Sequence, residues 1–126
     1  FAAGRPVEMI FTPHLVPMNR GILTTTYARL QAGVSAAAVR EVLEEKYREE
    51  KFVQVLPPGL YPHTKWVYGS NMVQIGIYTD ETSGRVILVS ALDNLTKGAS
   101  GQAIQNLNIM LGITESKSLN FPGVHP

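Results

Sequence analysis

Two apolar segments joined by a short polar turn decide the predicted fold: NMVQIGIYT at residues 71–79 and RVILVSAL at residues 85–92, with DETSG between them. Both segments are rich in β-branched residues and the turn ends in Gly84, a pattern typical of an antiparallel hairpin. The run from Val86 to Val89 is apolar without interruption, which predicts a strand covered on both faces. We expect a helix over one face and a partner subunit over the other.

Three more strands are predicted from shorter patterns, at residues 7–12, 22–30 and 52–56. The first places Val7, Met9 and Phe11 on one side with a period of two, and the second is rich in β-branched residues. The third is followed by two prolines, which cannot continue a paired strand. The proline-interrupted segment 60–68 predicts no regular element.

Two amphipathic helices are predicted, at residues 36–50 and at about residues 99–111. Ser35 is a suitable N-cap for the first, Arg40 and Glu44 form an i,i+4 pair on its expected solvent face, and Gly112 suits the end of the second. The apolar stripes are Val39, Val42, Leu43 and Tyr47 in the first helix, and Ala99, Ala103, Ile104, Leu107, Met110 and Leu111 in the second. The sum is one α+β domain over residues 1–126, a mostly antiparallel or mixed sheet covered by two main helices.

The composition excludes several kinds of function. With no Cys among its 126 residues, the chain can hold no disulfide, thiolate zinc site or cysteine nucleophile. Eleven basic against ten acidic residues argue against a nucleic-acid partner, and no segment approaches the ~20 apolar residues that span a bilayer. The N-terminus lacks the features of a signal peptide and an initiator Met, so we expect a cytoplasmic protein from which this chain is excised. Plastid import with a removed transit peptide would leave the same sequence.

His14 and Arg20 are the first candidates for chemistry, because one proline-stiffened loop at residues 12–21 carries both. A fixed imidazole suits proton transfer near neutral pH, although a histidine that only caps the loop also fits the sequence. Arg20, followed by Gly21, could bind a carboxylate or phosphate through two hydrogen bonds, or lie in solvent. Together the two residues would place a proton donor beside an anion-binding group.

Small residues at the start of the second predicted helix, KGASG at residues 97–101, are a further candidate. Backbone N–H groups and the helix dipole could receive a phosphate or the polar edge of a cofactor there. The alternative is a tight helix-to-sheet contact that needs small side chains, and it is favoured because no G-x-G-x-x-G motif or βαβ pattern is present. His63 and His125 have no carboxylate or second His at ligand spacing, so no metal site is predicted.

Four motifs, in order, resemble the N-acetyl-gamma-glutamyl-phosphate reductases, a family of arginine biosynthesis. They are FTPHLVPMNRG at residues 11–21, TKWVYGSN at 64–71, DETSGRV at 80–86 and DNLTKGASGQA at 93–103. The resemblance covers essentially the whole chain. It implies a substrate and dimerisation domain similar to the C-terminal domain of glyceraldehyde-3-phosphate dehydrogenase. A dinucleotide-binding domain that this chain lacks would precede it and bind most of the NADP.

The resemblance also implies a reaction, the NADPH-dependent reduction of N-acetyl-glutamyl 5-phosphate to the 5-semialdehyde and phosphate. The nucleophile would be a cysteine of the preceding domain, so the isolated chain is expected to be inactive. His14 would be the catalytic acid–base, Arg20 would bind the substrate's phosphate or carboxylate, and Asn94 or Gly98 would lie near the nicotinamide. The sheet would form the interface of a homo-oligomer.

Two alternatives remain open from the sequence. A related reductase of lysine biosynthesis, acting on a carrier-linked aminoadipyl phosphate, would share the proton chemistry and differ in the groups that hold the substrate. A non-catalytic oligomerisation module would keep the sheet for its dimer contacts, and His14 would then be incidental.

Overall fold

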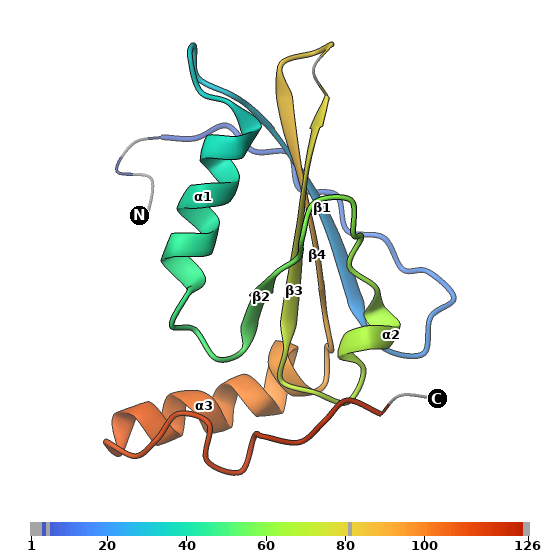
Figure 1. The fold of residues 1–126 in the computed structure, drawn as a ribbon. Coiled ribbons are helices and arrows are strands. Elements are labelled where there is room, and N and C mark those ends of the chain that lie inside the picture. Colours follow the sequence, from blue (N-terminus) through green and yellow to red (C-terminus); the bar gives the residue numbers. More distant parts are fainter. Residues whose placement is uncertain (1–3, 5, 81, 125–126) are drawn as a thin grey trace.

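A computed structural model describes residue 4, residues 6–80 and residues 82–124, and it contains an α+β domain built on a four-stranded sheet (Figure 1). The strand order is β1-β4-β3-β2, with β1 at Ile22–Arg29, β2 at Val53–Val55, β3 at Val73–Asp80 and β4 at Arg85–Leu92. β4 pairs antiparallel with β1 and β3, whereas β2 runs parallel to β3. The predicted α+β class and the mixed, mostly antiparallel sheet are confirmed.

The β3–β4 hairpin forms as predicted, with Asp80 opposite Arg85 at its closed end. The carboxylate of Asp80 accepts hydrogen bonds from the backbone N–H groups of Thr82 and Ser83, which holds the turn. Glu81, between Asp80 and Thr82, lies outside the described residues.

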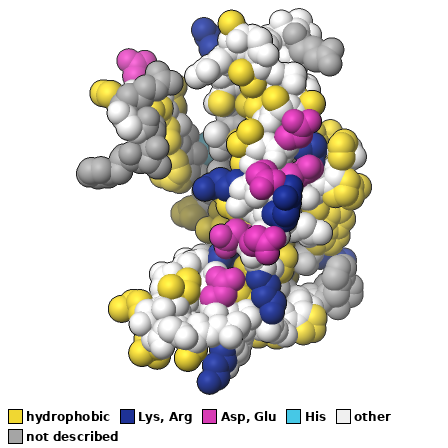
Figure 2. All heavy atoms as spheres, turned by 60° about the vertical axis from the view of Figure 1, so that its left-hand side comes forward, with side chains coloured by type: hydrophobic (Ala, Val, Ile, Leu, Met, Phe, Trp, Pro, Cys, Tyr) yellow, Lys and Arg dark blue, Asp and Glu magenta, His cyan; other side chains and the backbone are white. Residues whose placement is uncertain are grey.

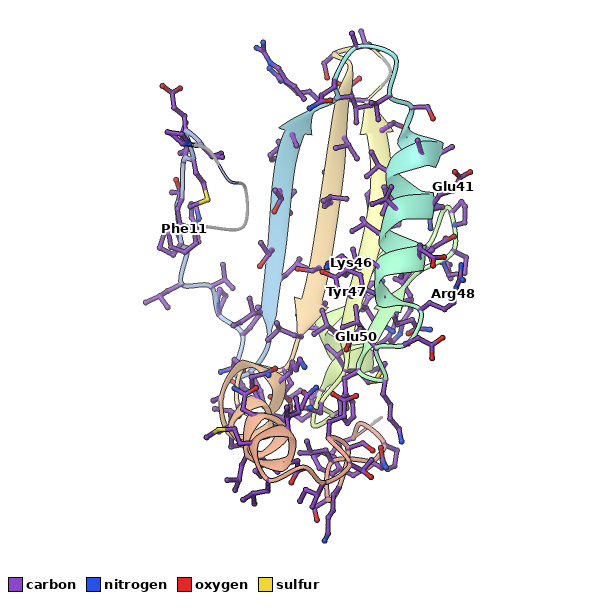
Figure 3. All side chains as sticks on the ribbon, turned by 90° about the vertical axis from the view of Figure 1, so that its left-hand side faces the viewer. Phe11, Glu41, Lys46, Tyr47, Arg48 and Glu50 are labelled. Carbon is purple, nitrogen blue, oxygen red and sulfur yellow. The ribbon has the colours of Figure 1, made fainter. Side chains whose placement is uncertain are left out.

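Residues 7–12 form no strand, so that prediction was wrong. Figure 3 shows Phe11 on a segment that stands away from the sheet beyond its β1 edge, whereas α1 (Ala36–Tyr47) lies near the other edge, and Ile10 is 95% exposed. An extended segment becomes a strand only where its N–H and C=O groups pair with a neighbour. Within the described ranges β1 pairs with β4 alone, so residues 7–12 form no ladder with its outer edge.

Helix α1 lies over β2 and β3 (Figure 1) and begins where Ser35 predicts, with the Ser35 hydroxyl oxygen accepting from the N–H of Ala38 at 3.1 Å. Its predicted stripe is half-buried apart from Val42, which is 65% exposed. The predicted Arg40–Glu44 pair forms, but the expectation that it lies on the solvent face was wrong for the Arg40 side chain, which is 15% exposed. Besides contacting Glu44 at 3.3 Å, it reaches inward and donates from Nη1 to the carbonyl of Leu56 at 2.6 Å.

The charged residues of α1 mix both signs along its surface. Figure 2 shows Lys, Arg, Asp and Glu side chains interleaved in one band, with no large area of a single sign on that face. Such a band is typical of a solvated helix face.

The second main helix differs from its prediction in both start and orientation. It begins with a π-helical turn, η1 (Thr96–Ser100), and continues as α3 (Gly101–Met110) across the end of the sheet (Figure 1). Its buried side chains are Gln105 and Asn108, whereas the predicted apolar stripe is exposed, Met110 by 83%. The amide of Asn108 donates to two backbone carbonyls of the following segment, so polar partners rather than the sheet decide which face turns inward.

The buried apolar core is small and gathers around β3, β4 and the segments beside them: Phe52, Leu56, Val67, Ile77, Val86, Ala91 and Leu119. Residues 60–68, for which the sequence predicted no regular element, contain the short helix α2 (Thr64–Val67). In β4, Val86 and Ala91 are buried and point to opposite faces of the sheet, whereas the four residues between them are half-exposed, so each face of this strand is covered in part among the described residues. No helix in the described part of the chain is long and apolar enough to cross a membrane.

Candidate functional site

Segments far apart in the sequence meet at Asp93, the residue that follows β4. Its side chain is fully buried. Oδ2 accepts a hydrogen bond from the N–H of Gly69 at 2.6 Å, in the turn after α2. Oδ1 accepts from the N–H groups of Leu95 at 2.8 Å and Thr96 at 3.0 Å, at the start of η1. One carboxylate therefore ties the end of the sheet to two turns.

Arg20 is the charged partner of this carboxylate. Its Nε lies 2.6 Å from Asp93 Oδ2, and the carbon of its guanidinium lies 4.8 Å from the ring centroid of Tyr68. The N–H of Nε is not aligned with the carboxylate, so the contact is an ion pair rather than a directed hydrogen bond. The Arg20 side chain keeps 22% of its surface exposed.

The electrostatics of the pair favour the charged form of both groups. Burial alone raises the pKa of Asp93. Four neighbours outweigh this effect and hold the pKa at about 2: the N–H groups of Gly69 and Thr96, the Arg20 guanidinium and the N–H of Leu95. The Asp93 carboxylate in turn raises the pKa of Arg20 above its ordinary value. At neutral pH the site therefore contains a fixed carboxylate and a fixed guanidinium.

Asn94 holds the residue next to Arg20. Its Oδ1 accepts a hydrogen bond from the N–H of Gly21 at 2.7 Å. Gly21 has φ +116°, and a Cβ there would lie 2.9 Å from the Cβ of Thr64, so this position requires glycine. The end of the predicted His14–Arg20 loop is thus attached to two consecutive residues after β4.

Gly98 lies in η1, where the structure favours the packing explanation of the small residues. Its N–H donates to the backbone carbonyl of Asp93 at 2.9 Å, and a Cβ would lie 3.3 Å from Cδ1 of Leu92. Because the Asp93 side chain already accepts from Leu95 and Thr96, the first N–H groups of this helix are capped from within the chain.

His14 stands apart from this cluster. Its ring is exposed, and Nδ1 lies 3.0 Å from the carbonyl oxygen of Thr12. No hydrogen bond or ion pair found among the described residues joins it to Arg20, Asn94 or Gly98, whereas those three share Asp93 and its neighbours. His63 packs its ring against Trp66 at 4.5 Å between centroids. His125 lies outside the described residues.

A cleft of about 410 Å³ lies beside this cluster, lined by Thr64, Lys65, Tyr68 and Val124. Tyr68 belongs to both, since its ring carries the Arg20 guanidinium and also lines the cleft. Sequence reasoning missed Asp93, Lys65 and Tyr68 as site residues, although all three lie inside the resembling motifs. For Asp93 the sequence did contain a signal, because a lone acidic residue directly after an apolar strand must find partners when it is buried.

Comparison with known proteins identifies the relatives of this chain. The N-acetyl-gamma-glutamyl-phosphate reductase of Moorella thermoacetica is 53% identical over 124 residues, which is 98% of this chain and 36% of the relative. Proteins of the same name from Pelotomaculum thermopropionicum and Rhodospirillum rubrum are 52% and 53% identical, again over 36% of their length. The chain thus spans 36% of the length of these relatives, and the predicted resemblance is confirmed.

The family model that describes the dimerisation domain of semialdehyde dehydrogenases matches residues 1–94. This match includes the loop with His14 and Arg20, all four strands, and Asp93 and Asn94. It covers most of the chain, and the chain therefore belongs to the semialdehyde dehydrogenase dimerisation-domain family.

Proposed function

We propose that this chain is the substrate-binding and dimerisation domain of an NADP-dependent reductase. The reaction is the conversion of N-acetyl-glutamyl 5-phosphate to N-acetyl-glutamate 5-semialdehyde and phosphate in arginine biosynthesis. The proposal is carried by the fixed guanidinium of Arg20 beside Asp93, in a chain whose relatives bear the reductase name. The dinucleotide-binding domain and the cysteine nucleophile belong to the part of a longer, cytoplasmic protein outside this chain.

Arg20 is proposed to bind the phosphate or the carboxylate of the substrate. A guanidinium held by Asp93 and stacked on Tyr68 loses little freedom when an anion binds, so more of the interaction energy appears as affinity. Lys65, which lines the neighbouring cleft, adds a second positive charge on the path of an anionic substrate.

His14 is the proposed acid–base group of this chain. With Nδ1 donating to the carbonyl of Thr12, Nε2 is the nitrogen left to give or take a proton. The segment that carries the ring is exposed, so we propose that the part of the protein outside this chain holds it during the reaction.

Asn94 has the chemistry to contact a nicotinamide. Its Oδ1 is used by the N–H of Gly21, which leaves the two N–H donors of Nδ2 for a carboxamide oxygen. Gly98, four residues on, presents no side chain there. NADPH, when bound, supplies the hydride of the reduction. The role proposed for Asn94 is to fix the orientation of the nicotinamide ring, and Gly98 would lie near that ring and leave space for it.

The exposed β1 edge of the sheet is the proposed interface with a second copy. Leu23 and Tyr27, which lie on the same face of β1, are 52% and 68% exposed. An apolar sheet face of this kind is stable when a second copy covers it.

The test uses the full-length protein in an assay of NADPH oxidation with the acyl phosphate. Arg20→Lys should raise KM for the acyl phosphate, because an ammonium cannot bind an oxyanion with a planar pair of donors. His14→Gln should lower kcat by about 10²-fold or more if the ring transfers a proton. His63→Gln is the matched control, since the His63 ring packs on Trp66 and no hydrogen bond or ion pair among the described residues joins its side chain to the Arg20 cluster.

Each result decides one part of the proposal. Wild-type kcat in His14→Gln would remove His14 from the mechanism and leave Arg20 in place. A higher kcat/KM for a carrier-linked aminoadipyl phosphate would assign the protein to the lysine-pathway reaction. No activity with either substrate, in a protein that sediments as an oligomer, would identify a non-catalytic module.

A further inference from the structure

We infer that Asp93 is the positioning residue of this site, the group that sets Arg20 and Asn94 in a fixed relation to each other. The inference rests on the proposed function, because Arg20 and Asn94 are the proposed contacts to substrate and cofactor. Asp93 itself is fully buried and therefore touches neither ligand.

The two oxygens of the carboxylate hold different parts of the site. Oδ2 faces the N–H of Gly69 and Nε of Arg20, each at 2.6 Å. Oδ1 faces the N–H groups of Leu95 and Thr96 at 2.8 and 3.0 Å, and these two bonds set the turn in which Asn94 lies. A displacement of this one side chain would therefore move both ligand-binding groups.

Two further contacts connect the same parts. Tyr68 precedes Gly69, so the bond from Asp93 to the Gly69 N–H also fixes the ring that lies under the Arg20 guanidinium. Asn94 binds the N–H of Gly21, the residue after Arg20, at 2.7 Å. Arg20 is thus restrained by its side chain, by the ring beneath it and by the adjacent backbone.

The surroundings of Asp93 require a carboxylate rather than an isosteric amide. All four partners of its two oxygens are donors: the N–H groups of Gly69, Leu95 and Thr96, and the cationic Arg20. An asparagine would have to turn its NH₂ group toward one of these sets, so two donors would meet and a buried pairing would be lost in either orientation. The Asp93→Asn substitution therefore displaces the donors that face one of the two oxygens, while it keeps the shape of the side chain.

The experiment compares Asp93→Asn with wild type in the full-length protein. Asp93→Asn should lower kcat/KM for the acyl phosphate by up to about 100-fold, chiefly through KM, because a displaced guanidinium binds the ground-state anion less well. KM for NADPH should rise in the same variant, through Asn94. Asp80→Asn is the matched control: Asp80 also caps a turn through two N–H groups, but at the opposite end of the hairpin, and its kinetic constants should stay within about twofold of wild type.

A double-mutant cycle separates positioning from a general loss of stability. If Asp93 acts through Arg20, Arg20→Lys should cost much less in the Asp93→Asn background than in wild type. Multiplicative effects would overturn the inference, as would wild-type KM values in a folded Asp93→Asn protein. A wild-type protein without reductase activity would instead refute the proposed function.

Asn94→Ala supplies the test if Asp93→Asn does not fold. It removes the bond to the Gly21 N–H together with the amide proposed to contact the nicotinamide, and it leaves the Asp93 contacts in place. The inference requires KM for the acyl phosphate to rise in this variant, because the backbone beside Arg20 is released. A change confined to NADPH would overturn the coupling between the two groups.

Discussion

Replacing Gly101 by Ala is expected to destabilise the protein, although alanine is ordinarily the better helix former. Gly101 has helical dihedral angles, φ −65° and ψ −39°, so Ala would gain about 1 kcal/mol from helix propensity alone. However, a Cβ at this position would overlap Oδ1 of Asn71 and lie 2.9 Å from the carbonyl carbon and oxygen of Thr96. The Thr96 atoms belong to the backbone and cannot rotate away.

The magnitude follows from what must move. Asn71 is buried, and its Nδ2 donates to Oε1 of Gln105 at 3.1 Å. Displacing it breaks a buried hydrogen bond, which costs about 1–3 kcal/mol, and overpacking against Thr96 costs about 1–3 kcal/mol more. After subtraction of the propensity gain, the free energy of unfolding should fall by about 3 kcal/mol.

Urea unfolding, followed by the fluorescence of the single tryptophan, Trp66, measures this difference. Gly98→Ala is the matched control in the same helix, because its Cβ would meet the flexible end of Leu92 at 3.3 Å, and it should change stability by less than about 1 kcal/mol. In an Asn71→Ala background the Gly101→Ala penalty should shrink. A Gly101→Ala protein as stable as wild type would refute the steric argument.

Two further predictions concern stability. The pKa of Asp93 is about 2 in the folded protein against an ordinary 3.8. The stability that its contacts provide is therefore complete above about pH 4 and is lost as the pH falls through 2. At about 1.36 kcal/mol per pH unit, the free energy of unfolding falls by at most about 2 kcal/mol. Urea titrations from pH 5 to pH 2 should show this loss in wild type and not in Asp93→Asn, and an equal loss in both would assign it to other carboxylates. Ser35→Ala should lower the free energy of unfolding by about 1 kcal/mol, because the N–H of Ala38 loses its cap, and an unchanged urea midpoint would contradict that role.

The elements that the sequence predicted correctly are those whose causes are local. The β3–β4 hairpin follows from two apolar runs around a turn that Asp80 caps, and α1 starts at Ser35 because a hydroxyl three residues before Ala38 can accept its N–H. Each of these interactions joins residues that are close in the sequence. The local sequence pattern therefore contains both partners of each interaction.

The incorrect predictions concern elements whose partners are distant in the sequence. The alternation in residues 7–12 is typical of a strand, but a strand also needs a partner within hydrogen-bonding distance, and this segment stands away from the outer edge of β1. The apolar stripe of α3 predicts a buried face, yet Gln105 and Asn108 turn inward because Asn71 and the segment after α3 supply their hydrogen bonds. An amphipathic pattern reports which face is apolar and not what covers it.

The candidate site shows the same division most clearly. By itself the sequence determined the fold class, the hairpin, the family resemblance and the candidates Arg20 and Asn94. Only the tertiary structure brought those two residues together at Asp93, since the donors around its carboxylate come from positions 20, 69, 95 and 96. The physical reason is that a buried carboxylate must be surrounded by donors on all sides, and a folded chain supplies them from whichever segments happen to meet there.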